Sequence, residues 1–120
     1  MTSKKFVENF YKSDALTNSA AMETYMHPEV MLDWNSSKGF LQLRLGDLLK
    51  LADELGKAYE RSKVRITHLV GDGSNVAVRY SHFVKTIENP REEMLLAHFI
   101  VIWELRDGLL YRGFQMSQPS

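Results

Sequence analysis

The sequence predicts an α+β fold, with a curved antiparallel sheet wrapped around three N-terminal helices. Apolar residues recur at a period of about 3.6 in the N-terminal half and at every second position from residue 62 onward. Helical segments therefore come first and long strands come last, an order typical of α+β domains. Short turns join the strands, which favours antiparallel neighbours. The chain has 120 residues and neither a repeat nor a linker, so we expect one domain over residues 1–120.

The N-terminal third is expected to contain two short helices and a strand. Residues 3–12 carry apolar side chains at helical spacing after a serine that can cap a helix. Residues 16–25 form the second helix, which ends at His27-Pro28 because the residue before a proline avoids the helical region. Residues 29–35 fit a strand, and the "NSSKG" that follows fits a turn.

The segment "FLQLRLG", residues 40–46, fits two structures. Its leucines alternate with polar residues as in a strand, yet the same leucines suit the start of a helix. Gly46 is unfavourable inside a helix, and Asp47 is a good N-cap. We therefore expect the third helix to run from Leu48 to about Arg61, after a strand that completes a hairpin.

Three long strands are expected to follow. Residues 64–70 and 76–84 alternate apolar with polar side chains on either side of a "GDGSN" turn. Residues 94–105, "MLLAHFIVIWEL", are apolar on both faces, so this strand should be covered on both. The Asp-Gly turn after it leads to a last strand over residues 109–117.

Composition excludes several classes of function. Fifteen basic side chains balance fifteen acidic ones, so no net field attracts nucleic acid or an anionic membrane. The absence of cysteine removes disulfides and thiolate chemistry. No apolar run approaches the ~20 residues of a membrane span, and "GDGSN" lacks the lysine and helix of a phosphate loop. We expect a cytoplasmic protein with no cofactor, no nucleic-acid partner and no membrane contact.

Three segments in order carry a resemblance to a known family: "YMHPEVMLDW", "LGDLL" and "WELRDGLLYR". They match a helix-ending aromatic followed by a strand that carries Asp, then the start of a third helix, then an aromatic-rich hairpin closed by Asp-Gly. Over nearly its whole length the chain resembles the nuclear transport factor 2, ketosteroid isomerase, scytalone dehydratase and SnoaL-like polyketide cyclase superfamily. The resemblance implies a cone-shaped fold with a central pocket for a small apolar molecule.

The resemblance also implies which strand faces line that pocket. The alternation of side chains agrees for the third and fourth strands, and does not decide the fifth. The other face of the fifth strand would need cover, which suggests a homodimer through the outer face of the sheet. The implied lining residues are Val64, Ile66, His68, Val76, Val78, Tyr80, His82, Ala97, Phe99, Val101, Trp103, Gly113, Gln115 and Ser117.

Asp33 and His82 are the candidate catalytic residues. The resemblance places Asp33 where ketosteroid isomerase-like proteins keep a general base, and an apolar pocket would raise its pKa and make it a better base. The alternative is that Asp33 faces solvent or accepts hydrogen bonds from the adjacent turn. His82, if it faces inward, fits an acid, a base or a ligand hydrogen-bonding group, and the alternative is a buried structural histidine.

The chain also departs from the isomerase pattern. Asn9 and Val101 fall where that enzyme has its oxyanion tyrosine and protonated aspartate, so we do not expect a standard ketosteroid isomerase. We expect no metal site, because the histidines of three successive strands are not level with one another. The remaining candidate ligand contacts are Tyr80, Trp103, Gln115, His68 and Phe99, with Tyr11 as a further donor.

Two functions remain open from the sequence. One is a cofactor-independent isomerase, dehydratase or cyclase that moves a proton on an apolar carbonyl compound. The other is a non-catalytic dimeric module of the same fold that binds a ligand or associates with a protein. An open cavity would favour the first, and a cavity filled by its own side chains would favour the second.

Overall fold

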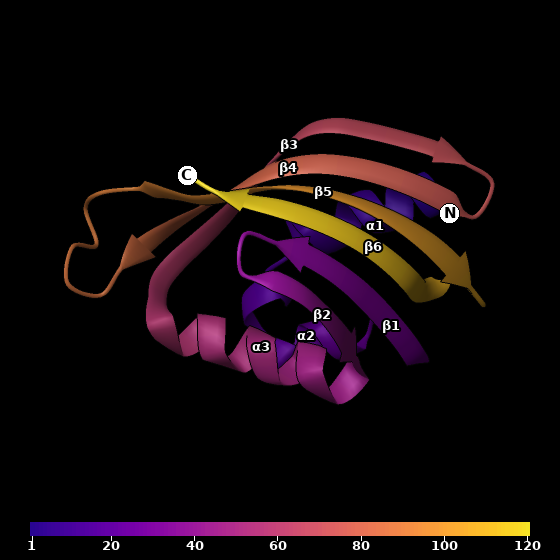
Figure 1. Ribbon diagram of the computed structural model, residues 1–120, viewed down its shortest axis with the longest axis horizontal. Coiled ribbons are helices and arrows are strands. Elements are labelled where there is room, and N and C mark those ends of the chain that lie inside the picture. Colours follow the sequence, from indigo (N-terminus) through magenta and orange to yellow (C-terminus); the bar gives the residue numbers. More distant parts are fainter.

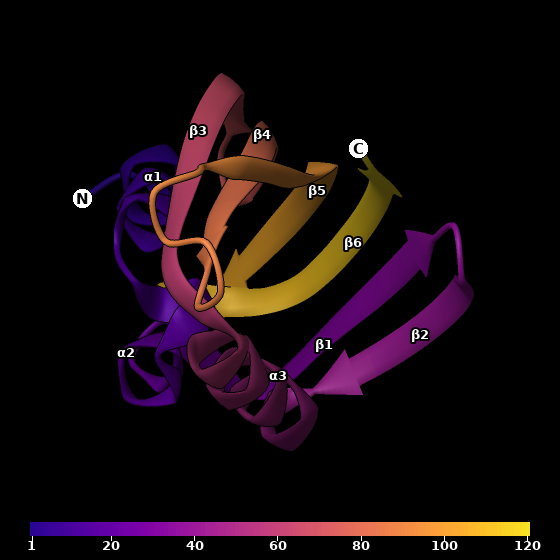
Figure 2. The same cartoon turned by 90° about the vertical axis from the view of Figure 1, so that its left-hand side faces the viewer.

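The six strands of the protein form one strongly curved sheet, and the helices lie on its concave side (Figures 1 and 2). The structure is a computed structural model that describes all 120 residues. No helix has both the length and the apolar character needed to cross a membrane. The elements are α1 (Ser3–Lys12), a 3₁₀ turn η1 (Ala15–Thr17), α2 (Ser19–Glu23), β1 (Met26–Ser36), β2 (Gly39–Arg44), α3 (Leu45–Ala58), β3 (Tyr59–Asp72), β4 (Asn75–Thr86), β5 (Met94–Arg106) and β6 (Leu109–Pro119).

The strand order is β2-β1-β6-β5-β4-β3, which confirms the α+β class but corrects one detail. All neighbours are antiparallel except β1 and β6, which run parallel, so the sheet is mixed. The reason is that β1 and β6 come from opposite ends of the sequence and are not joined by a hairpin. Their register sets Leu32 beside Gly113 and Trp34 beside Gln115.

The second predicted helix is shorter than expected. The Asn18 side chain accepts a hydrogen bond from the Ala21 backbone N–H at 3.2 Å and starts α2, so residues 16–25 divide into η1 and α2. The predicted stop at His27-Pro28 is wrong, because β1 has already begun at Met26 and runs through both residues.

The third helix begins earlier than predicted. Residues 39–44 form β2, and α3 starts at Leu45 instead of Leu48. Asp47 is therefore not the N-cap; it is the third residue of the helix, and its carboxylate accepts a hydrogen bond from the Arg44 backbone N–H at 2.9 Å. A carboxylate at the third helical position accepts a hydrogen bond from the backbone N–H of the N-cap residue, as in a capping box.

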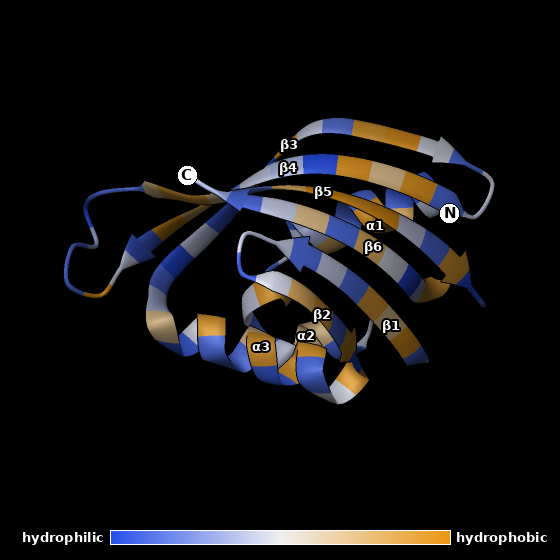
Figure 3. Ribbon diagram, viewed as in Figure 1, coloured by the Kyte–Doolittle hydropathy of each residue, from blue (hydrophilic) through white to orange (hydrophobic).

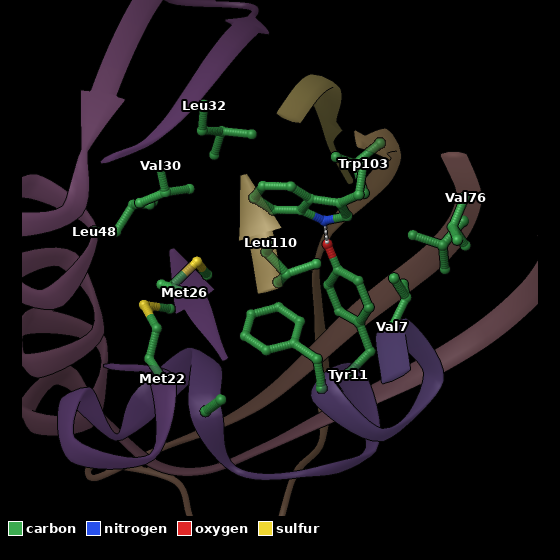
Figure 4. Packing of buried hydrophobic residues seen from close by; sticks show 14 of the residues in the cluster. Val7, Tyr11, Met22, Met26, Val30, Leu32, Leu48, Val76, Trp103 and Leu110 are labelled. Atoms are coloured by element: carbon green, nitrogen blue, oxygen red, sulfur yellow. Dashed lines mark hydrogen bonds between the residues drawn. The ribbon is translucent and has the colours of Figure 1, made fainter. Parts of the chain in front are cut away.

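The hydrophobic core lies between the concave face of the sheet and the helices. Trp103 on β5 is its largest fully buried side chain, and its indole N–H donates to the Tyr11 hydroxyl of α1 at 2.8 Å (Figure 4). Apolar and polar residues alternate along the strands, and the loop between β4 and β5 is mostly hydrophilic (Figure 3).

Gly113 leaves space beside β6 for the Trp103 ring. A Cβ atom at Gly113 would come within 2.6 Å of Leu32 Cδ1 and 2.7 Å of Trp103 Cζ3, both of which are buried. We therefore expect Gly113→Ala to lower the free energy of unfolding by about 1–3 kcal/mol through overpacking. Urea titration of both proteins would measure this difference.

Gly46→Ala is the matched control, because a Cβ atom at Gly46 in α3 meets nothing within 4 Å. It should raise the free energy of unfolding by about 0.5–1 kcal/mol, since alanine favours the helix. Equal effects of the two substitutions would contradict this account of Gly113.

Candidate functional site

An apolar chamber of about 130 Å³ lies inside the cone, between the helices and the sheet. Every element except β2, β3 and the β5–β6 turn contributes to its walls, and no carboxylate or formally cationic side chain is among them. Its lining residues are Phe10, Tyr11, Leu16, Met22, Met26, Leu32, Trp34, Leu48, Leu51, Leu55, Tyr80, His82, Leu96, Phe99, Trp103 and Gln115.

A second cavity of about 500 Å³, here called the vestibule, adjoins the chamber and shares part of its wall. The vestibule and the chamber share four lining residues, here called the constriction: Trp34, Leu55, Leu96 and Phe99. The remaining walls come from the β1–β2 turn, from Tyr59 and from the ends of β5 and β6. The Trp34 indole N–H donates to the Ser117 hydroxyl at 2.8 Å, which fixes one side of the constriction.

His82 is the most unusual group in the chamber. It lies on β4 opposite Ala97, only 3% of it is exposed, and its Nε2 atom is buried without a hydrogen-bond partner. Burial lowers the pKa of His82 from the ordinary 6.5 to about 4, because the charged form loses its hydration. The imidazole is therefore neutral at pH 7, and Nε2 is free either to donate or to accept, depending on the tautomer.

Two tyrosine hydroxyls lie deeper in the chamber. Burial raises the pKa of Tyr11, which accepts a hydrogen bond from Trp103, and raises that of Tyr80 well above 10. Both hydroxyls therefore stay protonated at neutral pH. The Tyr80 ring stacks on Phe99 with 4.8 Å between centroids and 10° between planes, so these two rings form a flat wall.

Asp33 does not face the chamber. Leu32 and Trp34 take the inner face of β1, so Asp33 lies on the outer face, beside Phe114 of β6. Its carboxylate accepts a hydrogen bond from the Gln42 side chain at 3.0 Å across the β1–β2 pair. The expectation of a base at the pocket rim is therefore not met, and the alternative of a local hydrogen-bonding role fits its position.

Three other expected contacts also lie outside the chamber. A bulge at Thr67 shifts the register of β3, so His68 is exposed on the outer side, with Nδ1 3.0 Å from the Thr67 hydroxyl. Asn9 lies on α1 and donates to the Met1 sulfur at 3.8 Å. Val101 is fully buried in the core and does not line the chamber.

The other candidates do come together. The chamber is lined by Tyr80, His82, Phe99, Trp103 and Gln115 together. Sequence reasoning missed the contribution of α3, whose Leu48, Leu51 and Leu55 were visible only as a helical stripe. It also missed Leu96, because a bulge between β4 and β5 adds this residue to the wall. No group of three metal-binding side chains is present.

Comparison with known proteins finds relatives by structure only. No protein-family model matches the sequence, and no curated protein matches it. The pinacolase BvnE of Penicillium brevicompactum superposes with a TM-score of 0.76 at 13% identity, over 96% of this chain and 82% of that one. The candidate polyketide cyclase IdmH of Streptomyces antibioticus gives 0.73 at 14% identity, over 98% and 92% of the two chains.

Two further structures extend the comparison. A candidate SnoaL-like polyketide cyclase of Jannaschia sp. CCS1 has a TM-score of 0.72 at 11% identity, over 96% of this chain and 84% of that one. A protein of Catenulispora acidiphila with a ketosteroid isomerase-like fold, in complex with trimethylamine, has 0.70 at 12% identity, over 92% and 82%. The chain therefore has the cone-like α+β fold shared by SnoaL-like polyketide cyclases, nuclear transport factor 2-like proteins and ketosteroid isomerase-like proteins.

Proposed function

We propose that this protein binds a small, largely apolar molecule in the chamber and holds its carbonyl or hydroxyl group through His82. The unpartnered Nε2 atom of His82 is the observation that carries the proposal. A buried polar atom without a partner is unfavourable by about 1–3 kcal/mol, so a site that keeps one is suited to a ligand that supplies the partner. The apolar walls match the body of such a ligand.

Proton transfer on a bound carbonyl compound, as in an isomerase, dehydratase or cyclase, is the second candidate. Its support is that His82 is neutral and so has a free lone pair, and that the Tyr11 and Tyr80 hydroxyls stay protonated as donors. Asp33 is not part of this proposed proton transfer, because its carboxylate accepts a hydrogen bond from Gln42 on the outer face of the sheet. The pinacolase BvnE, which has a similar fold, also supports this candidate.

We further propose that two copies associate through the outer face of the sheet, the arrangement also expected of a non-catalytic binding module. Several exposed apolar side chains lie next to one another on this face. Single exposed apolar residues are common on protein surfaces, but a contiguous patch indicates an interaction site. Ile100 and Ile102 of β5 and Phe114 and Met116 of β6 are 51%, 48%, 45% and 65% exposed. Since β5 and β6 are neighbours, these four form a continuous patch.

The chamber proposal predicts a preference for ligands with one polar group. Acetophenone and 1-phenylethanol offer His82 an acceptor and a donor, whereas α-methylstyrene has nearly the same shape and offers neither. We expect one of the first two to bind about 3- to 10-fold more tightly than α-methylstyrene, as one hydrogen bond allows. NMR titration of the wild-type protein would measure all three affinities.

His82→Phe should abolish this preference, while the matched His68→Phe on the exposed outer face should retain it.

The same acetophenone samples, prepared in D₂O, test catalysis. A catalyst of proton transfer should exchange the methyl protons of acetophenone for deuterium at least about 10² times faster than buffer alone does. Binding without exchange would remove the second candidate, and failure of all three compounds to bind would overturn the first.

The buried neutral histidine also predicts a pH dependence of stability. The pKa of His82 is lower in the folded protein than in the unfolded chain, so the unfolded chain binds the extra proton first as the pH falls. Stability from this group is therefore complete above about pH 6.5 and is lost progressively down to about pH 4, by up to about 3 kcal/mol. Urea unfolding at intervals between pH 7 and pH 4 would show the loss, and His82→Gln should flatten it. Equal slopes for the two proteins would contradict burial of the neutral imidazole.

The dimer proposal predicts that Ile100→Glu separates the copies, because it places a charge in the apolar patch. Light scattering should give the wild-type protein twice the mass of one chain and the variant the mass of one chain. Ile87→Glu is the matched control, since Ile87 is 59% exposed in the loop after β4, and it should remain dimeric. A wild-type mass of one chain would overturn the proposal.

A further inference from the structure

The charges around the chamber and the vestibule are distributed unevenly. No Asp or Glu lines either cavity, and Lys38 of the vestibule is the one formally charged side chain among all their lining residues. His82 adds no charge, because its pKa is about 4. A ligand that fills both cavities therefore meets an apolar inner end and a cationic outer end.

Lys38 is exposed, its backbone is fixed by a hydrogen bond, and its ammonium is not paired. It lies in the turn between β1 and β2, where its backbone N–H donates to the Ser36 hydroxyl at 3.2 Å. Lys5 and Lys12, by contrast, both form ion pairs with Glu8. The Lys38 ammonium has no carboxylate within ion-pair distance, and the neighbouring Ser37 hydroxyl, also in the vestibule wall, makes no hydrogen bond within the protein.

The sizes of the cavities indicate how a ligand divides between them. An apolar cavity of about 150 Å³ accepts one benzene ring, so the chamber of about 130 Å³ is suited to a group of that size. Any larger ligand extends through the constriction into the vestibule of about 500 Å³. A charged group is strongly disfavoured in the chamber, where it would lose its hydration without a partner. In the vestibule it keeps water and gains the field of Lys38.

We propose that the ligand is an amphipathic anion, with a ring-sized apolar group in the chamber and a carboxylate beside Lys38 and Ser37 in the vestibule. This inference rests on the proposed binding function and names the class of molecule that the site takes. The two ends fix the direction of the ligand, because exchanging them would bury the carboxylate and expose the apolar group.

The test is a series of 4-hydroxyphenylalkanoates with side chains of one to six methylene groups, each paired with its uncharged primary amide. The phenol hydroxyl provides a hydrogen-bonding partner for His82. The shortest chain at which the carboxylate binds better than the amide gives the length needed to place the carboxylate beside Lys38. We expect a preference of about two- to fivefold at that length, the size of a solvent-exposed ion pair. It should disappear in about 1 M salt, where exposed charges are screened.

Three variants make the test specific. Lys38→Gln should bring the affinity for the carboxylate down to that for the amide and leave the amide unchanged. Lys50→Gln is the matched control, because Lys50 is exposed on α3 and lines neither cavity, and it should retain the preference. His82→Phe should weaken acid and amide alike.

The outcomes separate this inference from the function on which it rests. Equal affinity of the wild-type protein for acid and amide at every length, or equal losses in Lys38→Gln and Lys50→Gln, would overturn the anion proposal. The chamber proposal would stand in that case if His82→Phe still weakened binding. Failure of the whole series to bind would overturn both.

Discussion

The hydrogen bond between Trp103 and Tyr11 joins parts of the chain that are 92 residues apart and connects α1 to β5 across the buried core. Trp103 needs a partner for its N–H because the indole is fully buried, and α1 supplies that partner from the opposite layer. The absence of a side chain at Gly113 leaves room for the ring. This contact holds α1 against the sheet, and both Tyr11 and Trp103 form part of the chamber wall.

Alternation of side chains predicted the inner face of β4, and the register confirms it: Val76, Val78 and Tyr80 are buried. On β3 the same rule held for Val64 and Ile66, which pack against the core, and failed after them. A bulge at Thr67 adds one residue and moves the later side chains to the other face, so His68 lies outside. Nothing in the local sequence marks that bulge.

Asp33 shows a different limit of sequence reasoning. Its position along the chain matched a known base, but the inner face of a strand goes to the side chains with more apolar surface to bury, here Leu32 and Trp34. A family resemblance of order and spacing therefore identified the fold without identifying the chemistry. His82, one of several polar side chains in the chamber, was visible from alternation alone, although its missing partner and low pKa follow only from the packing around it.

The constriction between the two cavities has a kinetic meaning as well as a steric one. Trp34 is tied to Ser117, and its ring centroid lies 6.3 Å from that of Phe99, so a molecule passing inward has to displace bulky side chains that are themselves anchored. Rearrangement of these side chains, and not diffusion, then limits the rates of ligand association and dissociation, and both rates are lowered. A ligand held only by modest contacts would consequently stay longer than its affinity alone suggests.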